Sequence, residues 1–564
     1  MGATESKMAF RKGVFRLFEQ RNIPSTAVDF WSQFWSLPTS ADDVFALVTT
    51  QDIRRVRDQA PENLVTLVEK LVSRATHVMH SPGFPSPVNP SSHLLNCTRI
   101  LTRLLPYLFE LDDEGHFENE LFWSSTDSPS LGVRLVHLTV DLLFLTEYTL
   151  PRVQVTSRHR INYMIWANGI GQRTAPALDG AMQSCRIETL RLLLVLLSKS
   201  MYGGAHAHNP WIETLVGGIG LGKKVTLALL CSLINTKPGA AALSSTSSSW
   251  NLPYEHMWMP GDGKEREGLL VALSTQLLLV LLDYTFPSPT SGSGNVFRVY
   301  VSRLHREEDF SLILRGFLHW MSQPVRAHAS YLPGSEKPIS FQQEMIMTFW
   351  LFLRLNSRFK AYALREGSAD LVGMLLCTAL MHKMDSKHPG MIRISLCLLQ
   401  SLTAEEGVAD RLAGAAVPDQ ANLPPAAKVT NFTTGTYQDY LVIMVHTLIT
   451  STRGTLTQLY PTLLLTLRNQ ASAMPLGLGV QAAQRLVQLL TAFASPGLLL
   501  AEEGNHRLLG YLIQTVDMAI RPKLKGSPER NAPLLLALVR AWEKVRFLQE
   551  FTLAKAQDQL MKRK

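Results

Sequence analysis

The chain has 564 residues, of which 46% are apolar and only 18% are charged. This composition is typical of a folded protein with a large buried core, and it excludes a chain that is disordered throughout. The formal net charge of +9 is small for this length, so it gives no indication of nucleic-acid binding, although it suits an anionic membrane surface.

The first element is the amino-terminal segment Met1–Lys7 (MGATESK), which fits the pattern M-G-x-x-x-[ST]. Removal of Met1 exposes the amine of Gly2, and only a residue without a side chain lets that amine reach the acyl donor in a narrow transferase channel. Ser6 fills the second required position, and Lys7 adds a positive charge beside it. The pattern predicts myristoylation of Gly2, and the alternative is an ordinary frayed terminus.

Residues 8–20 are expected to form a short helix with an apolar face and a basic face. One myristoyl chain binds a bilayer with an association constant of only about 10⁴ M⁻¹, and each basic residue near an anionic leaflet adds about 1 kcal/mol. The predicted membrane contacts are Lys7, Arg11, Lys12 and Arg16. The alternative is a first core helix whose apolar face is buried in protein. The residues of that face are Phe10, Val14, Leu17 and Phe18.

Residues 1–21 are therefore assigned to a myristoylated basic amphipathic segment, and residues 22–564 to a series of helices. Four aromatic residues within Phe30–Trp35 are spaced to pack one helix face as core. Asp42 and Asp43 suit a helix amino terminus, and Pro61 begins a helix that reaches His80. The helices expected after that are 94–110 (interrupted by Pro106), 132–148, 186–201, 223–235, 267–284, 296–304, 310–322, 340–356, 370–383, 391–403, 437–450, 456–468, 480–493, 506–520 and 533–560.

Polar breaks rich in Ser, Gly and Pro occur near residues 236–266, 286–295 and 413–435, and we expect flexible insertions there. No repeat of fixed period is found. A long series of helices without strands still predicts an all-α fold, an irregular α-solenoid in which helices stack as in HEAT or armadillo proteins. The alternative is a set of globular helical bundles. The sequence gives no prediction of oligomeric state.

Three stretches resemble catalytic or ligand-binding motifs without completing them. Gly217–Lys224 nearly matches the phosphate-binding G-x-x-x-x-G-K-[ST], but a lysine replaces the hydroxyl residue and no strand precedes it. His206 and His208 lack a third metal ligand nearby. The acidic residues of His305–Asp309 precede an apolar run and are expected to complement a helix dipole. We predict no catalytic residue, no metal site and no cofactor apart from the covalent myristate.

The remaining composition favours a reducing compartment and no membrane span. The five cysteines are odd in number and widely scattered, which favours free thiols. The longest uncharged runs, 269–282 and one around 440–452, are shorter than the roughly 18–20 apolar residues that cross a bilayer. The amino terminus also lacks the apolar region and cleavage site of a signal peptide.

Blocks of residues in order along almost the whole chain carry a family resemblance. The most specific is Ser302–Phe310 (SRLHREEDF). The other blocks are Met1-Gly2, Ser6-Lys7, Phe10–Lys12, Phe30-Trp31 with Phe34-Trp35, Asp43–Val48, Leu95–Cys97, Leu101–Arg103, Leu105–Tyr107, Ile313–Gly316, Phe341–Glu344 and Phe349-Trp350. In these blocks the chain resembles the high-temperature-induced dauer-formation proteins, and more distantly dymeclin.

The resemblance implies a non-catalytic peripheral protein, myristoylated at Gly2, on the cytosolic face of Golgi and trans-Golgi network membranes, with a cytosolic pool. Its implied function is protein sorting and secretory-vesicle maturation, with cytosolic trafficking proteins as partners and no nucleic acid. Two other interpretations stay open from the residues alone. One is a soluble helical-repeat adaptor without a lipid anchor, and the other is an enzyme whose site assembles from distant residues.

Overall fold

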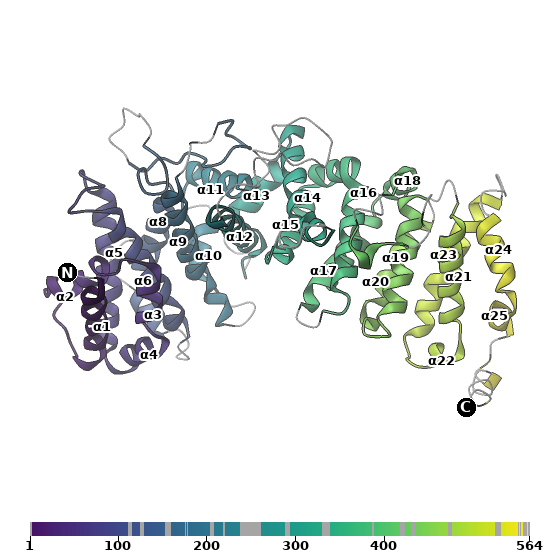
Figure 1. The fold of residues 1–564 in the computed structure, drawn as a ribbon, viewed down its shortest axis with the longest axis horizontal. Coiled ribbons are helices and arrows are strands. Elements are labelled where there is room, and N and C mark those ends of the chain that lie inside the picture. Colours follow the sequence, from purple (N-terminus) through teal and green to yellow (C-terminus); the bar gives the residue numbers. More distant parts are fainter. Residues whose placement is uncertain are drawn as a thin grey trace. The chain divides into compact units, whose positions relative to one another are not determined.

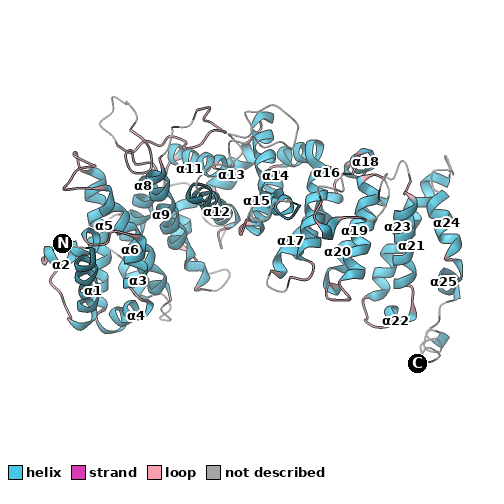
Figure 2. Cartoon of the chain, in the orientation of Figure 1, coloured by secondary structure: helices cyan, strands magenta, loops and turns pink. Residues whose placement is uncertain are grey.

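Helices account for the regular secondary structure of the described residues, which hold no β-strand and only a few isolated β-bridges (Figure 2). The structure is a computed structural model. It describes residues 3–110, 116–124, 129–152, 160–174, 176, 179–203, 208–217, 220–236, 261–287, 294–329, 339–385, 388–417, 423–429, 432, 435–471, 477–524, 532–550, 552, 554–555 and 561. For these residues the predicted all-α fold is confirmed, and the solenoid arrangement stays a prediction.

The chain divides into two compact units, Met1–Leu304 and His305–Lys564. In the first unit consecutive helices pack side by side, as α5 and α6 do (Figure 1). Its helices are α1 (Ala3–Glu19), α2 (Val28–Ser36), α3 (Ala41–Leu47), α4 (Thr50–Gln59), α5 (Pro61–His80), α6 (Ser91–Phe109), α7 (His116–Glu118), the π-helix η1 (Asn119–Trp123), α8 (Leu131–Leu142), α9 (Gly180–Leu197), η2 (Ser198–Met201), α10 (Pro210–Val216), α11 (Lys223–Asn235), α12 (Gly261–Asp283) and α13 (Val296–Arg303).

In the second unit, helices that are not consecutive along the chain also pack together, since α16 contacts α14 and α19 as well as α17. Its helices are α14 (Glu307–Ala329), α15 (Gln342–Leu355), α16 (Ser357–His382), α17 (Pro389–Thr403), α18 (Val408–Gly414), η6 (Pro425–Ala427), α19 (Tyr437–Ser451), η7 (Thr457–Leu459), α20 (Tyr460–Ala471), α21 (Val480–Phe493), α22 (Pro496–Leu499), α23 (Asn505–Leu524), α24 (Ala532–Arg540), α25 (Trp542–Arg546) and η9 (Phe547–Glu550).

Several predicted boundaries are confirmed because a local signal marks them. Pro61 occupies the first position of α5, where its missing N–H has no intrahelical partner to lose. Helices α11 and α21 also run between the predicted residues. Asp43 completes a capping box with Ser40 at the start of α3, as the acidic pair before Val44 indicated.

Other boundaries were wrong. Helix α6 runs through Pro106 to Phe109, so the proline does not end the helix although it has no N–H to donate to the carbonyl four residues earlier. Helix α8 ends at Leu142, six residues before the predicted end. The buried hydroxyl of Thr149 donates to the Leu142 carbonyl over 2.7 Å and so occupies an acceptor that a longer helix would use.

The predicted insertions lie largely outside the described residues, which omit 237–260, 288–293, 418–422, 430–431 and 433–434. The described part of 413–435 includes the end of α18 and the short helix η6. Among the described helices, none combines the length and the apolar composition that a bilayer-spanning segment requires.

Candidate functional site: the outer face of helix α1

Helix α1 begins at Ala3 and packs against α2, α3, α4 and α5 through its apolar stripe. Phe10, Val14 and Leu17 are between 1% and 4% exposed. The ring of Phe10 meets that of Phe34 on α2 edge to face, with the centroids 6.0 Å apart. Phe18, the fourth residue expected in this stripe, is only half-buried. Because the other three are covered by protein, they are not the face that α1 could offer to a membrane.

The carboxyl end of α1 is held by Asn63 on α5, which is only 1% exposed. Its amide nitrogen donates to the carbonyl groups of Leu17, over 2.9 Å, and Gln20, over 2.6 Å. Its amide oxygen accepts from the backbone N–H of Ile23 over 2.9 Å. These bonds satisfy carbonyl groups that the end of a helix leaves without partners, so α1 is fixed to the fold at this end.

Two of the predicted membrane contacts form ion pairs inside the fold. Lys7 lies 3.0 Å from the carboxylate of Asp43, and Arg11 binds the carboxylate of Asp52 and the carbonyl of Leu47. Both carboxylates are buried, and each also caps its own helix, α3 or α4. The side chains of Lys7 and Arg11 are 50% and 26% exposed.

The hydrogen bonds around these two aspartates stabilise their charged form. Burial by itself raises the pKa of Asp43, but hydrogen bonds from Thr39 and Lys7 outweigh it and hold the pKa below its usual range. The pKa of Asp52 is lowered in the same way, because hydrogen bonds from Arg11 and Thr49 outweigh burial. The docking of α1 therefore depends on ionised carboxylates.

We expect acid to loosen α1 before the rest of its unit. Carboxyl groups with depressed pKa values stabilise the fold above the unfolded value of about 3.9, and that stability is lost as the pH falls toward the folded pKa. The protection factors of the α1 amides, each the ratio of the intrinsic to the observed exchange rate, should be lower at about pH 3 than at pH 7. An Asp52→Asn variant should show weaker pH dependence, because one titrating group is gone. Equal protection of α1 in the parent protein at both pH values would contradict this coupling.

The opposite side of α1 is exposed and combines cations with apolar side chains. Lys12 and Arg16 are exposed there, Met8 is 59% exposed, and Phe15 is half-buried beside them. Lys12 is four residues from Met8, three from Phe15 and four from Arg16, so these positions share one face of the helix. The face has both features that favour the interface of an anionic bilayer.

Helix α4 extends this surface. The rings of Phe15 and Phe18 meet at 5.6 Å, and the exposed guanidinium of Arg55 on α4 lies 5.7 Å from the ring of Phe18. Arg16 stays near the helix, because its Nε donates to Gln20 over 2.7 Å. We call this surface the outer patch. It consists of Met8, Lys12, Phe15, Arg16, Phe18 and Arg55.

The structure thus divides the four predicted membrane contacts into two pairs. Lys12 and Arg16 lie in the outer patch, whereas Lys7 and Arg11 neutralise buried carboxylates. Arg55 was missed, although the sequence carries a signal for the helix that holds it. Thr49 and Asp52 form a capping box at the start of α4, which places Arg55 on a helix. Gly2 lies outside the described residues.

The motif-like stretches do not assemble a second site in the described part of the chain. Gly217 follows α10 and Gly222 precedes α11, so a helix, and not a strand, comes before this loop. His208 lies 2.9 Å from Glu213, while His206 is outside the described residues. Glu307 begins α14 and pairs with Arg365 over 2.9 Å. No group of three potential metal ligands occurs among the described residues.

Comparison with known proteins places the chain in a family. The family model described as high-temperature-induced dauer-formation protein matches residues 1–564. Human Protein HID1 is 31% identical, and the match covers 96% of this chain and 71% of the human protein. A Hid-1 family protein and a Ubp5-interacting protein, both of Schizosaccharomyces pombe, are 28% and 26% identical, each over 95% of this chain and 67% of the relative. No solved structure matches. The chain belongs to the high-temperature-induced dauer-formation protein family.

Proposed function

We propose that this chain is an N-myristoylated peripheral membrane scaffold on the cytosolic face of the Golgi and trans-Golgi network. There it would act, without catalysis, in protein sorting and in the maturation of secretory vesicles. Gly2 carries the lipid, the outer patch supplies the second membrane contact, and the helical body recruits cytosolic trafficking proteins. Family membership supports this proposal, and so do the residues around the amino terminus.

The observation that carries the proposal is the exposed, basic and apolar outer patch on the helix that begins one residue after Gly2. Adjacent Cα atoms are about 3.8 Å apart, so an acyl chain on Gly2 would leave the protein at the end of α1. A myristoyl chain alone binds weakly, and cations near the membrane surface each add about 1 kcal/mol. Lys12, Arg16 and Arg55 are exposed cations suited to this second contact.

The helical body of the chain and the names of its relatives support a scaffold function. The described residues form an all-α body with no group of three potential metal ligands. The names of the matched relatives refer to no catalytic activity, and one of them refers to a protein partner, Ubp5. A large helical surface suits the recruitment of other proteins.

A second candidate is a soluble helical-repeat adaptor that needs no lipid. The burial of Phe10, Val14 and Leu17 favours it, because α1 is then an ordinary core helix. The ion pairs of Lys7 and Arg11 point the same way, since these cations already serve the fold. The two candidates differ in whether the amine of Gly2 is acylated.

Mass spectrometry of the amino-terminal peptide, combined with vesicle flotation, separates the candidates. We expect myristate on Gly2 when an N-myristoyltransferase is co-expressed. At about 1 mM accessible anionic lipid, the acyl chain alone should give roughly ten bound molecules for each free one, and the three patch cations should raise this ratio roughly a hundredfold. Gly2→Ala should leave most of the protein unbound with its fold unchanged. An unmodified amine in protein from its native cells, with no flotation, would favour the soluble adaptor. Imaging both variants in cells then tests the Golgi location.

A further inference from the structure

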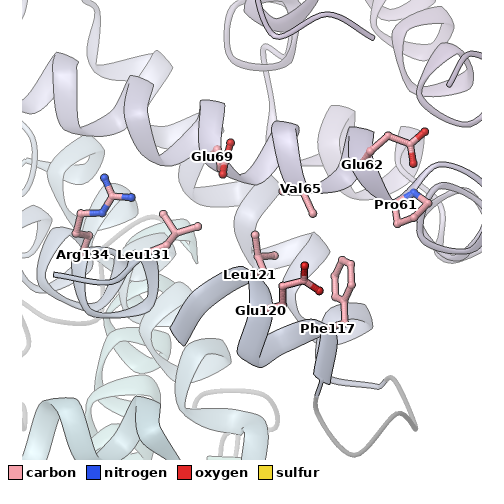
Figure 3. A pocket seen from close by; sticks show the side chains of 9 residues that line it. All are labelled: Pro61, Glu62, Val65, Glu69, Phe117, Glu120, Leu121, Leu131 and Arg134. Atoms are coloured by element: carbon pink, nitrogen blue, oxygen red, sulfur yellow. The ribbon is translucent and has the colours of Figure 1, made fainter. Parts of the chain in front are cut away.

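A cavity of about 360 Å³ opens in the first unit between α5, the α7–η1 segment and α8 (Figure 3). Its apolar wall comes from three elements, with Val65 on α5, Leu121 on η1 and Leu131 on α8. Leu121 and Leu131 are buried, and Val65 is half-buried. Ligand pockets in proteins hold roughly 300–1,000 Å³, so this cavity suits a small part of a larger ligand.

Carboxylates surround this apolar wall. Glu62 is already neutralised, because Arg21 donates to both its oxygens over 3.1 and 3.2 Å, and this bonding lowers its pKa to about 2. Glu69 on α5 and Glu120 on η1 are exposed, and no cation among the described residues pairs with either. In a protein of net charge +9, the cavity therefore carries a local negative charge at these two residues.

The two ends of the cavity differ, with Phe117 toward one end and Arg134 at the other, so a charged ligand would bind in one orientation. Figure 3 shows Phe117 beside Glu120 toward one end of the cavity, and a carboxylate next to an aromatic ring suits a cation. Arg134 of α8 lies at the other end with Leu131. An extended ligand would place its positive charge near Glu120 and any negative charge near Arg134.

Three ligand classes do not fit this arrangement. Anions are repelled by Glu69 and Glu120. An acyl chain would desolvate these carboxylates at a high cost. The chain's own amino-terminal lipid is also distant, because α1 has 17 residues and so a length of about 25 Å, and the cavity adjoins its far end through Arg21 and Glu62. A metal ion lacks a ligand set in the described part of the chain.

We propose that this cavity binds a short segment of a partner protein in which a lysine or arginine stands next to apolar residues. The cationic head group lies between Glu120 and Glu69, with its stem and the neighbouring apolar side chain on Val65, Leu121 and Leu131. Charge complementarity selects the cation, and the apolar wall selects against fully hydrophilic basic segments. The inference rests on the cavity and is independent of lipid anchoring.

Two labelled pentapeptides test the proposal with the full chain. One has the sequence Ala-Leu-Arg-Leu-Ala, and the other has Glu in place of the central Arg. Fluorescence anisotropy should show saturable binding of the arginine peptide, at least tenfold tighter than that of the glutamate peptide. The double variant Glu69→Lys/Glu120→Lys should weaken the binding of the arginine peptide at least tenfold. Both side chains are exposed, so the fold should persist, and circular dichroism checks this.

The matched control is Glu5→Lys/Glu19→Lys, which makes the same change in net charge on exposed positions of α1. It should leave peptide binding within twofold of the parent protein. A second variant, Val65→Trp, fills the cavity without a change in charge and should also weaken binding. Absent binding of the arginine peptide would overturn the proposal, as would equal binding of both peptides. Binding that survives both Glu69→Lys/Glu120→Lys and Val65→Trp would place the peptide elsewhere and overturn it too.

Discussion

Reversal of the three cations of the outer patch should release the acylated protein from anionic vesicles. Lys12, Arg16 and Arg55 each contribute about 1 kcal/mol near an anionic leaflet, so their loss alone weakens binding by roughly a hundredfold. The variant Lys12→Glu/Arg16→Glu/Arg55→Glu adds repulsion, so we expect at least this decrease in the vesicle partition coefficient. The measurement is sedimentation with vesicles of increasing phosphatidylserine content.

A control variant distinguishes the effect of the outer patch on vesicle binding from the effect of net charge. Arg173, Lys223 and Lys224 are exposed in the same unit, and their reversal to Glu changes the net charge by the same amount. This control should retain most of the binding. The difference between the two variants should also shrink in about 1 M salt, where the screening length falls to about 3 Å. Equal loss in both variants would indicate general electrostatic attraction and would contradict a membrane contact at the outer patch.

The sequence left open whether α1 is a core helix or a membrane helix, because both have an apolar stripe. The structure shows that α1 has one face buried in the fold and one exposed face. Phe10 and Leu17 pack inside, whereas Lys12 and Phe15 lie outside. Two basic residues of α1 pair with carboxylates that are remote in sequence. Asp43 is 36 positions from Lys7. Asp52 is 41 positions from Arg11. Helical spacing reports which residues share a face, and it cannot report what that face contacts.

Elements with a local signal were predictable, and elements defined by remote contacts were not. Pro61 and the apolar periodicity that follows it are sufficient to locate α5. The end of α8 depends on Thr149, seven residues after Leu142, whose hydroxyl is directed to that carbonyl by the folded chain. The cavity beside α5 could not be predicted from the sequence either, because Val65, Leu121 and Leu131 come from three separate elements.

Trp211 anchors the side of the first unit that contains the cavity. The residue lies on α10, is 0% exposed, and packs against Phe122 and Trp123 of η1 with ring centroids 4.9 Å apart in each case. Its indole N–H donates to the buried carboxylate of Glu118 over 2.7 Å. The neighbouring Lys199 lies 2.5 Å from the other carboxylate oxygen. Trp211 therefore fixes the α7–η1 segment through both packing and a charge-assisted hydrogen bond.

Replacement of this indole should be among the most destabilising single substitutions in the unit. Truncation of a buried Trp to Ala typically costs about 3–5 kcal/mol, and loss of a hydrogen bond to a buried carboxylate adds to that cost. We expect Trp211→Ala to lower the free energy of unfolding by at least about 4 kcal/mol, measured by urea denaturation with hydrogen exchange in α8 and α10. Trp211→Phe keeps an aromatic ring but removes the donor and part of the indole volume, so about 2 kcal/mol should be lost.

The same substitution tests how the cavity is supported. The π-helix that Trp211 contacts contains Glu120 and Leu121, which line the cavity. Trp211→Ala should therefore weaken the binding of the arginine peptide even where the unit stays folded. Trp542 on α25 of the second unit is 49% exposed and serves as the matched control, with an expected change within about 1 kcal/mol and no effect on the peptide. A Trp211→Ala protein as stable as its parent would show that η1 is held by other contacts.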